Sequence, residues 1–334
     1  MTDRVLITGI SGFIASHVAQ RLLEQGYAVR GTVRTKAKGA AVKAALEKNG
    51  VDVSKLEIVG ANLDDDAGWE KAVKDCRYIQ HIASPFPLEN PSEREALVPE
   101  ARAGAQRVLE HGLSAGVERI VMTSSMVAMM GRKGRKGEVK LTEADWSDPD
   151  WKPLRAYAVS KTRAELSAWA YVKAQNMEPR LTTVCPGLVL GPDTYDNGGA
   201  SLALIKALLA GEFPMVPKLA YPIIDVRDCA AIHVAAMTAE KAAGRRLMAG
   251  SNTLWFKEIA AILRAAYPEV EKLPKSEMAN ILVKTMALFD DRLKSITPDI
   301  GIYHTADTGY VSSITRVMPR PAKEAVLAAA QSVG

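Results

Sequence analysis

Residues 4–15 read RVLITGISGFIA, and this stretch carries most of the information about the fold. A short apolar run leads into a glycine-rich turn, and apolar residues at helical spacing continue over 12–25. Gly9 and Gly12 permit a tight turn whose backbone amides approach a pyrophosphate at the start of the helix, and Ala15 lets that helix pack closely on the strand. The stretch therefore predicts a dinucleotide-binding turn, although the same pattern also fits a turn without a ligand.

The rest of the first half alternates short β-rich runs with amphipathic segments of helical length. This βαβα order, with nearly continuous apolar strands, is typical of a parallel sheet covered by helices on both faces. Right-handed crossovers then place the carboxyl ends of all strands, and hence the site, along one edge. The predicted class is α/β, a doubly wound parallel sheet of the Rossmann type. We expect strands at 4–8, 28–33, 55–59, 78–82 and 119–122, and helices at 12–25, from the second strand to about 49, at 67–74 and at 92–115.

The pattern changes from about Gly191, where Pro and Gly become frequent and strands become short. Helices at 202–210 and 256–266 are interrupted by loops, which predicts a smaller C-terminal substrate domain that closes over the sheet edge. Residues 225–238 look like one more strand end and helix, so we expect the chain to re-enter the first domain near 222–250. The predicted organisation is a dinucleotide-binding domain over 1–190 and a mostly substrate-binding domain over 191–334.

Composition excludes several classes of protein. Of the 334 residues, 48% are hydrophobic and 24% charged, which suffices for a full core and excludes disordered, collagen-like and small disulfide-rich chains. No apolar run reaches the roughly 18 residues of a membrane-spanning helix, and the opening MTDRVLITGI lacks a signal-peptide pattern. Cys76, Cys185 and Cys229 lie far apart without a CxxC or Cys/His cluster, so we expect reduced, packed thiols and no metal site. These features favour a cytoplasmic protein.

The charge is slightly basic and partly concentrated in one loop. Lys and Arg number 43 against 38 acidic residues, a net charge of +5, and four basic residues lie in GRKGRKG at 131–137. A nucleic-acid binder would more often spread its charge along a groove with interleaved aromatic residues. The three glycines instead predict a flexible, solvated loop, with contact to an anion as the alternative. We therefore expect a small-molecule substrate and neither a nucleic-acid nor a membrane partner; monomer and homodimer both remain open.

The residues after the second strand distinguish between the two nicotinamide cofactors. An enzyme that prefers NAD usually places Asp or Glu here to bind the ribose hydroxyls. The sequence VRGTVRTKAKG at 29–39 instead places Arg34 at the strand end and Lys36 and Lys38 just beyond it. A guanidinium can hold a 2′-phosphate through two charge-assisted hydrogen bonds. The predicted cofactor is therefore NADP(H).

Three polar residues form a candidate catalytic set. Tyr157 and Lys161 are four residues apart in RAYAVSKTRAEL, so a helix places the phenol and the ammonium on the same face. The ammonium is expected to stabilise the phenolate and to lower the pKa of the phenol toward neutrality. Ser125 follows the fifth strand, where its hydroxyl could hydrogen-bond the substrate carbonyl oxygen that Tyr157 would protonate. The alternative is a serine that only satisfies backbone hydrogen bonds at the strand end.

Taken together, these residues resemble the extended short-chain dehydrogenase/reductase family over the whole chain. The similarity is strongest to the branch of dihydroflavonol reductases, cinnamoyl-CoA reductases and yeast-type aldehyde (methylglyoxal) reductases. The cinnamoyl-CoA reductases carry an Asn-Trp-Tyr-Cys-Tyr run that RAYAVSK at 155–161 lacks, which argues against acyl-CoA reduction. The shared strings are TGISGFIA, VRGTVRT, HIASPF, TSSMVA, YAVSK, CPGLVLGP and YPIIDVRDCAAIHV.

The resemblance implies roles for individual residues. Ser125, Tyr157 and Lys161 match the family's catalytic triad, and Lys161 would also hold the nicotinamide ribose. Asn62 stands where the family usually has Asp, so a hydrogen-bonding side chain is kept and a charge is lost. The positions matching the cofactor site are Gly9, Ser11, Gly12, Phe13 and Ile14 at the pyrophosphate; Arg34 and Lys38 at the 2′-phosphate; Asn62 and Leu63 at the adenine; Ala83, Ser84 and Thr123 at the nicotinamide ribose; Pro186, Gly187, Leu188 and Val189 at the carboxamide; and Ser201 near the cofactor.

The implied activity is reversible, NADPH-dependent reduction of an aldehyde or ketone to an alcohol. A nucleotide-sugar epimerase or dehydratase that uses NAD, and a non-catalytic protein that senses dinucleotides, are the alternatives. Apolar and aromatic residues on loops after strands or in the covering domain are candidates for the substrate walls and would favour apolar or aromatic carbonyl compounds. They are Pro85, Phe86, Met126, Met130, Tyr195, Phe213, Met215 and Tyr221.

Overall fold

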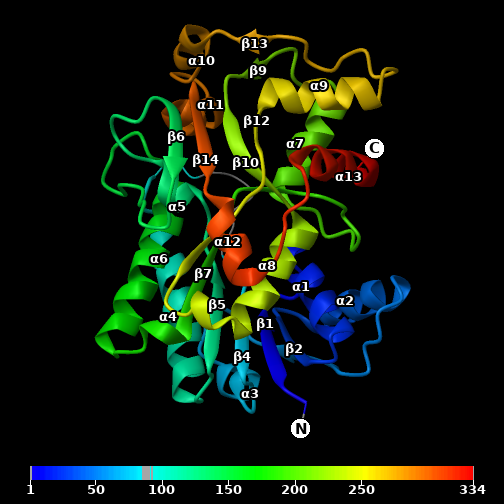
Figure 1. The fold of residues 1–334 in the computed structure, drawn as a ribbon, viewed down its shortest axis with the longest axis vertical. Helices are drawn as coiled ribbons and strands as arrows, with labels where there is room; N and C mark the ends of the chain where they lie inside the picture. The colour runs from blue at the N-terminus through cyan, green and yellow to red at the C-terminus, as the bar shows by residue number, and fades with distance from the viewer. Residues whose placement is uncertain (1, 85–90, 92, 334) are drawn as a thin grey trace.

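A parallel sheet of seven strands forms the centre of the protein (Figure 1). The computed structural model describes residues 2–84, 91 and 93–333. The strand order is β11-β7-β5-β4-β1-β2-β3, and every neighbouring pair is parallel, which confirms the predicted doubly wound class. The strands are β1 (Arg4–Thr8), β2 (Ala28–Val33), β3 (Leu56–Gly60), β4 (Tyr78–His81), β5 (Arg119–Thr123), β7 (Leu181–Pro186) and β11 (Arg246–Ala249).

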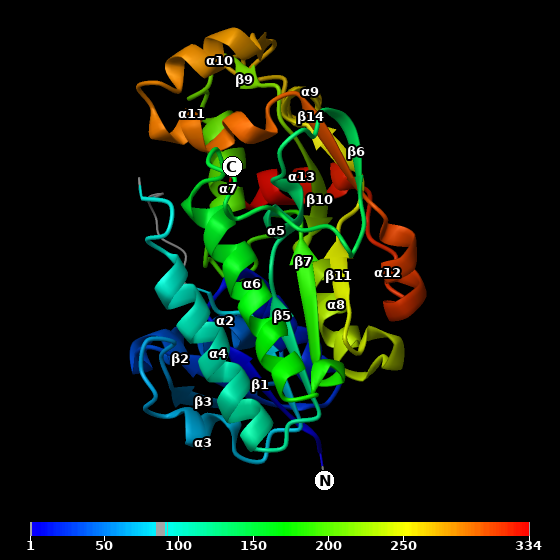
Figure 2. The same ribbon diagram turned by 90° about the vertical axis from the view of Figure 1, so that its left-hand side faces the viewer.

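Helices cover both faces of this sheet because alternate residues of each strand point to opposite sides. Val5 and Ile7 of β1 belong to the apolar cluster of α1 and α8, whereas Leu6 belongs to the cluster of α3, α4 and α6. Figure 2 shows α4 and α6 running side by side on the second face. All three cysteines are buried as free thiols. The helices of these layers are α1 (Phe13–Glu24), α2 (Lys36–Lys48), α3 (Trp69–Val73), α4 (Val98–Ser114), α6 (Ala156–Ala174) and α8 (Val226–Thr238).

A second, smaller sheet lies beyond the carboxyl ends of the first (Figure 1). Its order is β12-β10-β14-β6, and β8 pairs with β10. Its apolar cluster combines residues of α7, α9 and α13. Its strands are β6 (Gly137–Leu141), β8 (Leu188–Leu190), β10 (Ala220–Asp225), β12 (Thr253–Trp255) and β14 (Ile302–Ala306), and the helices on it are α7 (Ala200–Leu209), α9 (Phe256–Ala266) and α13 (Ala322–Val333).

Both halves of the chain contribute to both sheets. β6 comes from the first half and pairs with β14, while β11 comes from the second half and forms an edge of the large sheet. Helix α8, from the second half of the chain, packs against α1 from the first half. The remaining elements are short: α5 (Val127–Met130), α10 (Asn280–Met286), α11 (Asp291–Ile296), α12 (Thr308–Thr315), β9 (Val216–Pro217), β13 (Glu277–Met278), and the 3-10 turns η1 (Glu178–Arg180), η2 (Glu240–Ala242) and η3 (Thr297–Asp299).

Helix boundaries differ most from prediction where proline intervenes. The helix expected over 92–115 begins only at Val98, with Pro99 in its first turn, where the missing N–H has no intrahelical partner to lose. The helix expected over 256–266 has these bounds in the structure. Across the part of the chain that is described, no helix is both long enough and apolar enough to cross a membrane.

The basic loop 131–137 is only partly solvated, which corrects the sequence prediction. The guanidinium of Arg135 donates to the carbonyl oxygens of Met129 and Met130, the latter at 2.9 Å, and pairs with the carboxylate of Asp145. Its side chain is 11% exposed. The last carbonyls of the short helix α5 have no intrahelical donor, and Arg135 supplies one. The other three basic side chains of the loop are exposed.

Replacing Arg135 by Ser is therefore expected to lower the free energy of unfolding by about 1–3 kcal/mol, because buried carbonyls and Asp145 lose their donor. The matched control is the triple replacement of Arg132, Lys133 and Lys136 by Ser, which should stay within about 0.5 kcal/mol. Urea unfolding measures both. Equal losses in the two variants would contradict the structural role of Arg135.

Candidate active site

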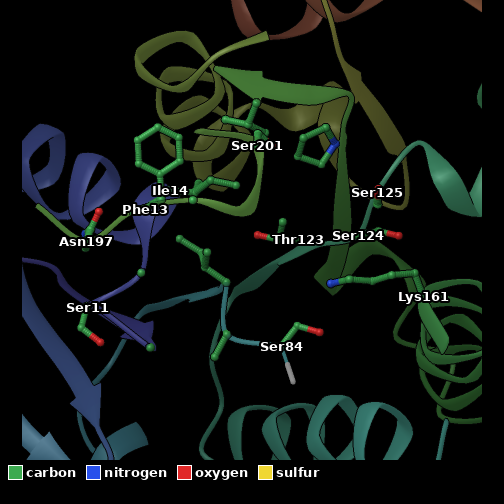
Figure 3. A pocket seen from close by; sticks show the side chains of 18 of the residues that line it. Ser11, Phe13, Ile14, Ser84, Thr123, Ser124, Ser125, Lys161, Asn197 and Ser201 are labelled. Carbon is green, nitrogen blue, oxygen red and sulfur yellow. The ribbon is translucent and has the colours of Figure 1, made fainter. Parts of the chain in front are cut away.

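A cleft of about 790 Å³ opens at the carboxyl ends of β1, β2, β4, β5 and β7 (Figure 3). The strand ends form its floor because parallel strands all point toward this edge. Asn197 and Ser201, from the second half of the chain, line the side opposite Ser84 and Lys161. The cleft thus lies between the large sheet and the segment that leads into α7.

The glycine-rich turn after β1 lines the cleft through Gly9, Ser11 and Gly12. Gly9 has φ +62°, and a Cβ there would lie 2.8 Å from the Cβ of Ala83, so glycine is required both for conformation and for space. The amide of Gly12 donates to the carbonyl of Gly9 at 2.9 Å and closes the turn. Because α1 follows Gly12, which has no side chain to cap the helix, the first amides of α1 remain available to an anion.

Thr8, the last residue of β1, connects this turn to the end of the neighbouring strand β4. Its hydroxyl accepts the amides of Ile82 and Ala83, both at 3.0 Å, and hydrogen-bonds to Nδ1 of His81 at 2.9 Å. Burial, with the charge of Lys161 nearby, lowers the pKa of His81 to about 3, so its ring is neutral. These contacts hold Ala83 and the following Ser84 against the glycine turn.

Two exposed basic side chains line the cleft after β2, the strand next to β1. Arg34 follows β2, and Lys38 lies in the first turn of α2. The hydroxyl of Thr35 accepts the amide of Lys38 at 3.4 Å and caps the helix, which fixes the backbone between the two cations. The carboxylate residue Asp64 also lines this region.

Ser125, Tyr157 and Lys161 all line the cleft, although they come from different elements. Ser125 follows β5, while Tyr157 and Lys161 are one turn apart on α6. The side chains of Tyr157 and Ser125 are hydrogen-bonded, and Nζ of Lys161 lies 6.0 Å from the centre of the Tyr157 ring. The geometry therefore brings the two hydroxyls together with the amine beside them.

Burial dominates the acidity of these groups, which corrects the predicted direction for the phenol. Burial raises the pKa of Tyr157, and the hydrogen bond with Ser125 offsets only part of this effect. Burial also lowers the pKa of Lys161 to about 8, against the opposite effects of Glu165 and Cys185. Near neutral pH the phenol is protonated and the amine is largely charged.

Most of the sequence-predicted cofactor residues line the cleft, but three do not. The carbonyl of Asn62 accepts the indole N–H of Trp69 at 2.8 Å, and the carbonyl of Leu63 accepts from Arg107. Leu188 packs against the apolar cluster of the second sheet. The predicted residues that line the cleft are Gly9, Ser11, Gly12, Phe13, Ile14, Arg34, Lys38, Ala83, Ser84, Thr123, Tyr157, Lys161, Pro186, Gly187, Val189 and Ser201.

Six of the eight residues predicted for the substrate walls do not line this cleft in the described structure. Met126 and Met130 are 1% and 4% exposed and pack in the core around the large sheet. Tyr195 packs edge-on against His17, and the hydroxyl of Tyr221 donates to Asp299 at 3.0 Å. None of these four, nor Phe213 or Met215, is among the described residues that line the cleft. Pro85 and Phe86 lie outside the described residues.

The sequence analysis missed the segment that covers the glycine turn. Asn197, Gly198 and Gly199 line the cleft. The side-chain Nδ2 of Asn197 donates to the hydroxyl of Ser16 on α1 at 2.7 Å, and its Oδ1 is buried with no hydrogen-bond partner among the described residues. An unpaired buried acceptor at a cleft wall is available to a ligand donor. The two side chains are 181 residues apart, and the local sequence contains no signal for this contact.

The fold and the cleft define a nucleotide-binding α/β protein of the Rossmann class. The chain belongs to the NAD dependent epimerase/dehydratase family, which matches residues 5–250. An uncharacterized oxidoreductase of Saccharomyces cerevisiae is 32% identical, over 82% of this chain and 85% of its own length. Cinnamoyl-CoA reductase CAD2 of Medicago truncatula is 31% identical, over 91% of this chain and 94% of its own length. Among solved structures, yeast methylglyoxal/isovaleraldehyde reductase Gre2 complexed with NADPH has a TM-score of 0.81 at 24% identity, covering 99% of this chain and 98% of that chain.

Proposed function

We propose that the protein is an NADPH-dependent reductase that converts an aldehyde or ketone to an alcohol. The observation that carries the proposal is the hydrogen-bonded pair of Tyr157 and Ser125 at the cleft, with Lys161 one helical turn away. Oxidoreductases and cinnamoyl-CoA reductases among the sequence relatives support carbonyl reduction, and the Gre2 complex supports NADPH as the cofactor.

The residues of the cleft fit a dinucleotide. Gly9 leaves free the space that a Cβ would occupy, and the start of α1 offers unpaired amides to a pyrophosphate. Arg34 and Lys38 supply the positive charge that a 2′-phosphate requires, and Asn197 has a buried oxygen that no described residue pairs with. When bound, NADPH supplies the hydride for the reduction.

The triad would stabilise and protonate the substrate oxygen. The hydroxyls of Ser125 and Tyr157 donate hydrogen bonds to the carbonyl oxygen and stabilise the negative charge that develops on it. Tyr157 then transfers its phenolic proton to that oxygen, and its raised pKa keeps the phenol protonated for this step. The ammonium of Lys161 stabilises the phenolate that remains and would also bind the ribose hydroxyls.

The two alternative functions have weaker support. An epimerase or dehydratase that holds NAD would favour an acidic residue where Arg34 stands. A non-catalytic dinucleotide sensor would have no need for a hydrogen-bonded Tyr157–Ser125 pair at the cleft beside a buried lysine. A panel of aldehydes, α-dicarbonyls, aryl ketones and dihydroflavonols, scored by NADPH consumption, tests the proposal. Turnover of none of them, together with epimerisation of a nucleotide sugar in the presence of NAD, would overturn it.

From Arg34 and Lys38, NADPH is expected to bind at least about tenfold more tightly than NADH, a difference of about 1.4 kcal/mol. Both basic side chains are exposed at the cleft, where they can pair with the additional phosphate. Fluorescence titration with the two reduced cofactors measures the ratio. Replacing Arg34 by Ala should reduce this ratio, and equal affinities in the wild type would contradict the predicted phosphate site.

A further inference from the structure

A buried carboxylate lies one helical turn beyond Lys161. Glu165 is 0% exposed, and its position on α6 continues the spacing of Tyr157 and Lys161. Its two oxygens accept hydrogen bonds from Ser124 Oγ at 2.6 Å and from Thr183 Oγ1 at 2.7 Å. The mechanism above does not use this group.

A buried guanidinium compensates this carboxylate. Arg246 on β11 forms two parallel hydrogen bonds to Glu165, Nε at 2.8 Å and Nη2 at 3.0 Å. Its Nη1 donates to the carbonyls of Glu143 and Asp145 at 2.9 and 2.5 Å, and its guanidinium lies 3.6 Å from the ring centre of Trp146. All three nitrogens of the guanidinium therefore donate and one of its faces lies on an aromatic ring, which gives the pair one geometry.

The carboxylate also ties together the strand ends that carry the site. Ser124, which donates to Glu165, directly precedes Ser125, and the amide of Ser124 donates to the carbonyl of Val184 on β7 at 2.7 Å. Thr183 lies on the same strand. One side chain thus connects α6, β5, β7 and β11 around the cleft.

We propose that Glu165 is a positioning residue: its carboxylate fixes Ser124, and through it Ser125, opposite Tyr157, and it supplies the negative charge that keeps Lys161 an ammonium. This inference rests on the proposed reductase function. It assigns to the Glu165–Arg246 pair an effect on the reaction besides its contribution to stability.

The groups that face Lys161 support the proposed charge effect of Glu165 on the Lys161 ammonium. Tyr157 and Glu165 lie on its own helix, His81 faces it from β4 and Cys185 from β7. His81 is neutral, because burial lowers its pKa to about 3, and burial raises the pKa of the Cys185 thiol to about 12. Burial raises the pKa of Glu165, but Arg246 and the hydroxyl donors outweigh it and hold it below its ordinary value. Glu165 is therefore the one charged acid among these groups near neutral pH.

The experiment measures the kcat of carbonyl reduction against pH for Glu165→Gln, Arg246→Met and the double variant, with saturating NADPH. Burial lowers the pKa of Lys161 to about 8, so we expect kcat to fall on the alkaline side of the pH profile as the ammonium loses its proton. Glu165→Gln and the double variant lack the negative charge of Glu165, so the alkaline limb of the pH profile should move to lower pH by about half a unit or more. Removing the positive charge in Arg246→Met leaves the limb in place or moves it upward. At neutral pH, kcat in Glu165→Gln falls about tenfold because Ser124 loses its strongest acceptor.

Two further measurements separate positioning from folding. The double variant leaves no charge unpaired, so it remains testable even where a single variant unfolds. The ¹³Cε signal of Lys161, assigned with Lys161→Met, should titrate at lower pH in Glu165→Gln than in the wild type. Asp228→Asn breaks another partly buried pair, with Arg320, and should lower stability without moving the alkaline limb.

The outcomes are distinct. A shift of the alkaline limb to lower pH in Glu165→Gln, without such a shift in Arg246→Met, supports the inference. A purely structural pair would instead lower stability in both variants and leave both pH profiles and the lysine titration unchanged. That second result would overturn it. A wild type without carbonyl reductase activity would instead contradict the proposed function, while the lysine titration would still test the charge effect.

Discussion

Replacing Tyr157 by Phe is expected to reduce the kcat of carbonyl reduction about 10²–10⁴-fold, the range that a positioned proton donor contributes. The phenol is hydrogen-bonded to Ser125 at the cleft, and its raised pKa keeps it protonated, so its removal leaves the substrate oxygen without a donor of comparable position. The ring itself remains in the variant, so the dissociation constant for NADPH should change by less than about threefold.

Steady-state kinetics and cofactor titration measure the two quantities. Tyr171→Phe is the matched control, because Tyr171 lies on the same helix away from the cleft and should keep near wild-type kcat. If Tyr157→Phe retained most of the activity, the proton would have to come from another group and the proposed triad would be wrong.

The largest effect on stability is expected from Arg246→Met, at about 3–5 kcal/mol of unfolding free energy near neutral pH. The side chains of Arg246 and Glu165 are 7% and 0% exposed, so the substitution leaves a carboxylate buried with only neutral donors. Arg245→Met is the control on the neighbouring residue. The Arg245–Glu143 pair is 42% and 35% exposed, so its loss should cost less than about 1 kcal/mol.

The deficit of Arg246→Met should shrink as pH falls. In the wild type the pKa of Glu165 is lowered, so its contribution to stability is present above the ordinary carboxyl pKa and is lost as pH falls through the lowered value. Without Arg246, burial raises the pKa of this carboxyl, which then takes up a proton at a higher pH and no longer carries an unpaired charge. Urea unfolding at neutral pH and at about pH 4.5 compares the two proteins. A deficit that grows toward acid would contradict this account.

Residues close together in the chain made the fold and much of the candidate site predictable. The turn at Gly9 follows a strand and opens a helix, and a parallel sheet places every such junction on the same edge. The spacing of Tyr157 and Lys161 is a property of a single helix, so the common orientation of the two side chains followed without knowledge of the fold. The same local reasoning placed the end of β10 and the start of α8 near Asp225.

Burial was much harder to predict. Met126 and Met130 were as suitable for a substrate wall as for a core, because an apolar side chain after a strand suits both, and only their packing around the large sheet places them inside. Arg135 has the composition of a solvated loop, yet its guanidinium binds the carbonyls at the end of α5. The predicted direction of the Tyr157 pKa was wrong for the same reason, since burial raises this pKa and the hydrogen bond with Ser125 offsets only part of the effect.

The order of residues along the chain thus specified the strands, the glycine turn, the basic residues after β2 and the phenol–amine spacing, because each depends on neighbours within a few residues. Folding alone specified the contact of Asn197 with Ser16, across 181 residues, and the pairing of Glu165 with Arg246, across 81. The physical reason is that helix and turn formation depend on local geometry, whereas burial and long-range pairing exist only once distant segments have packed together.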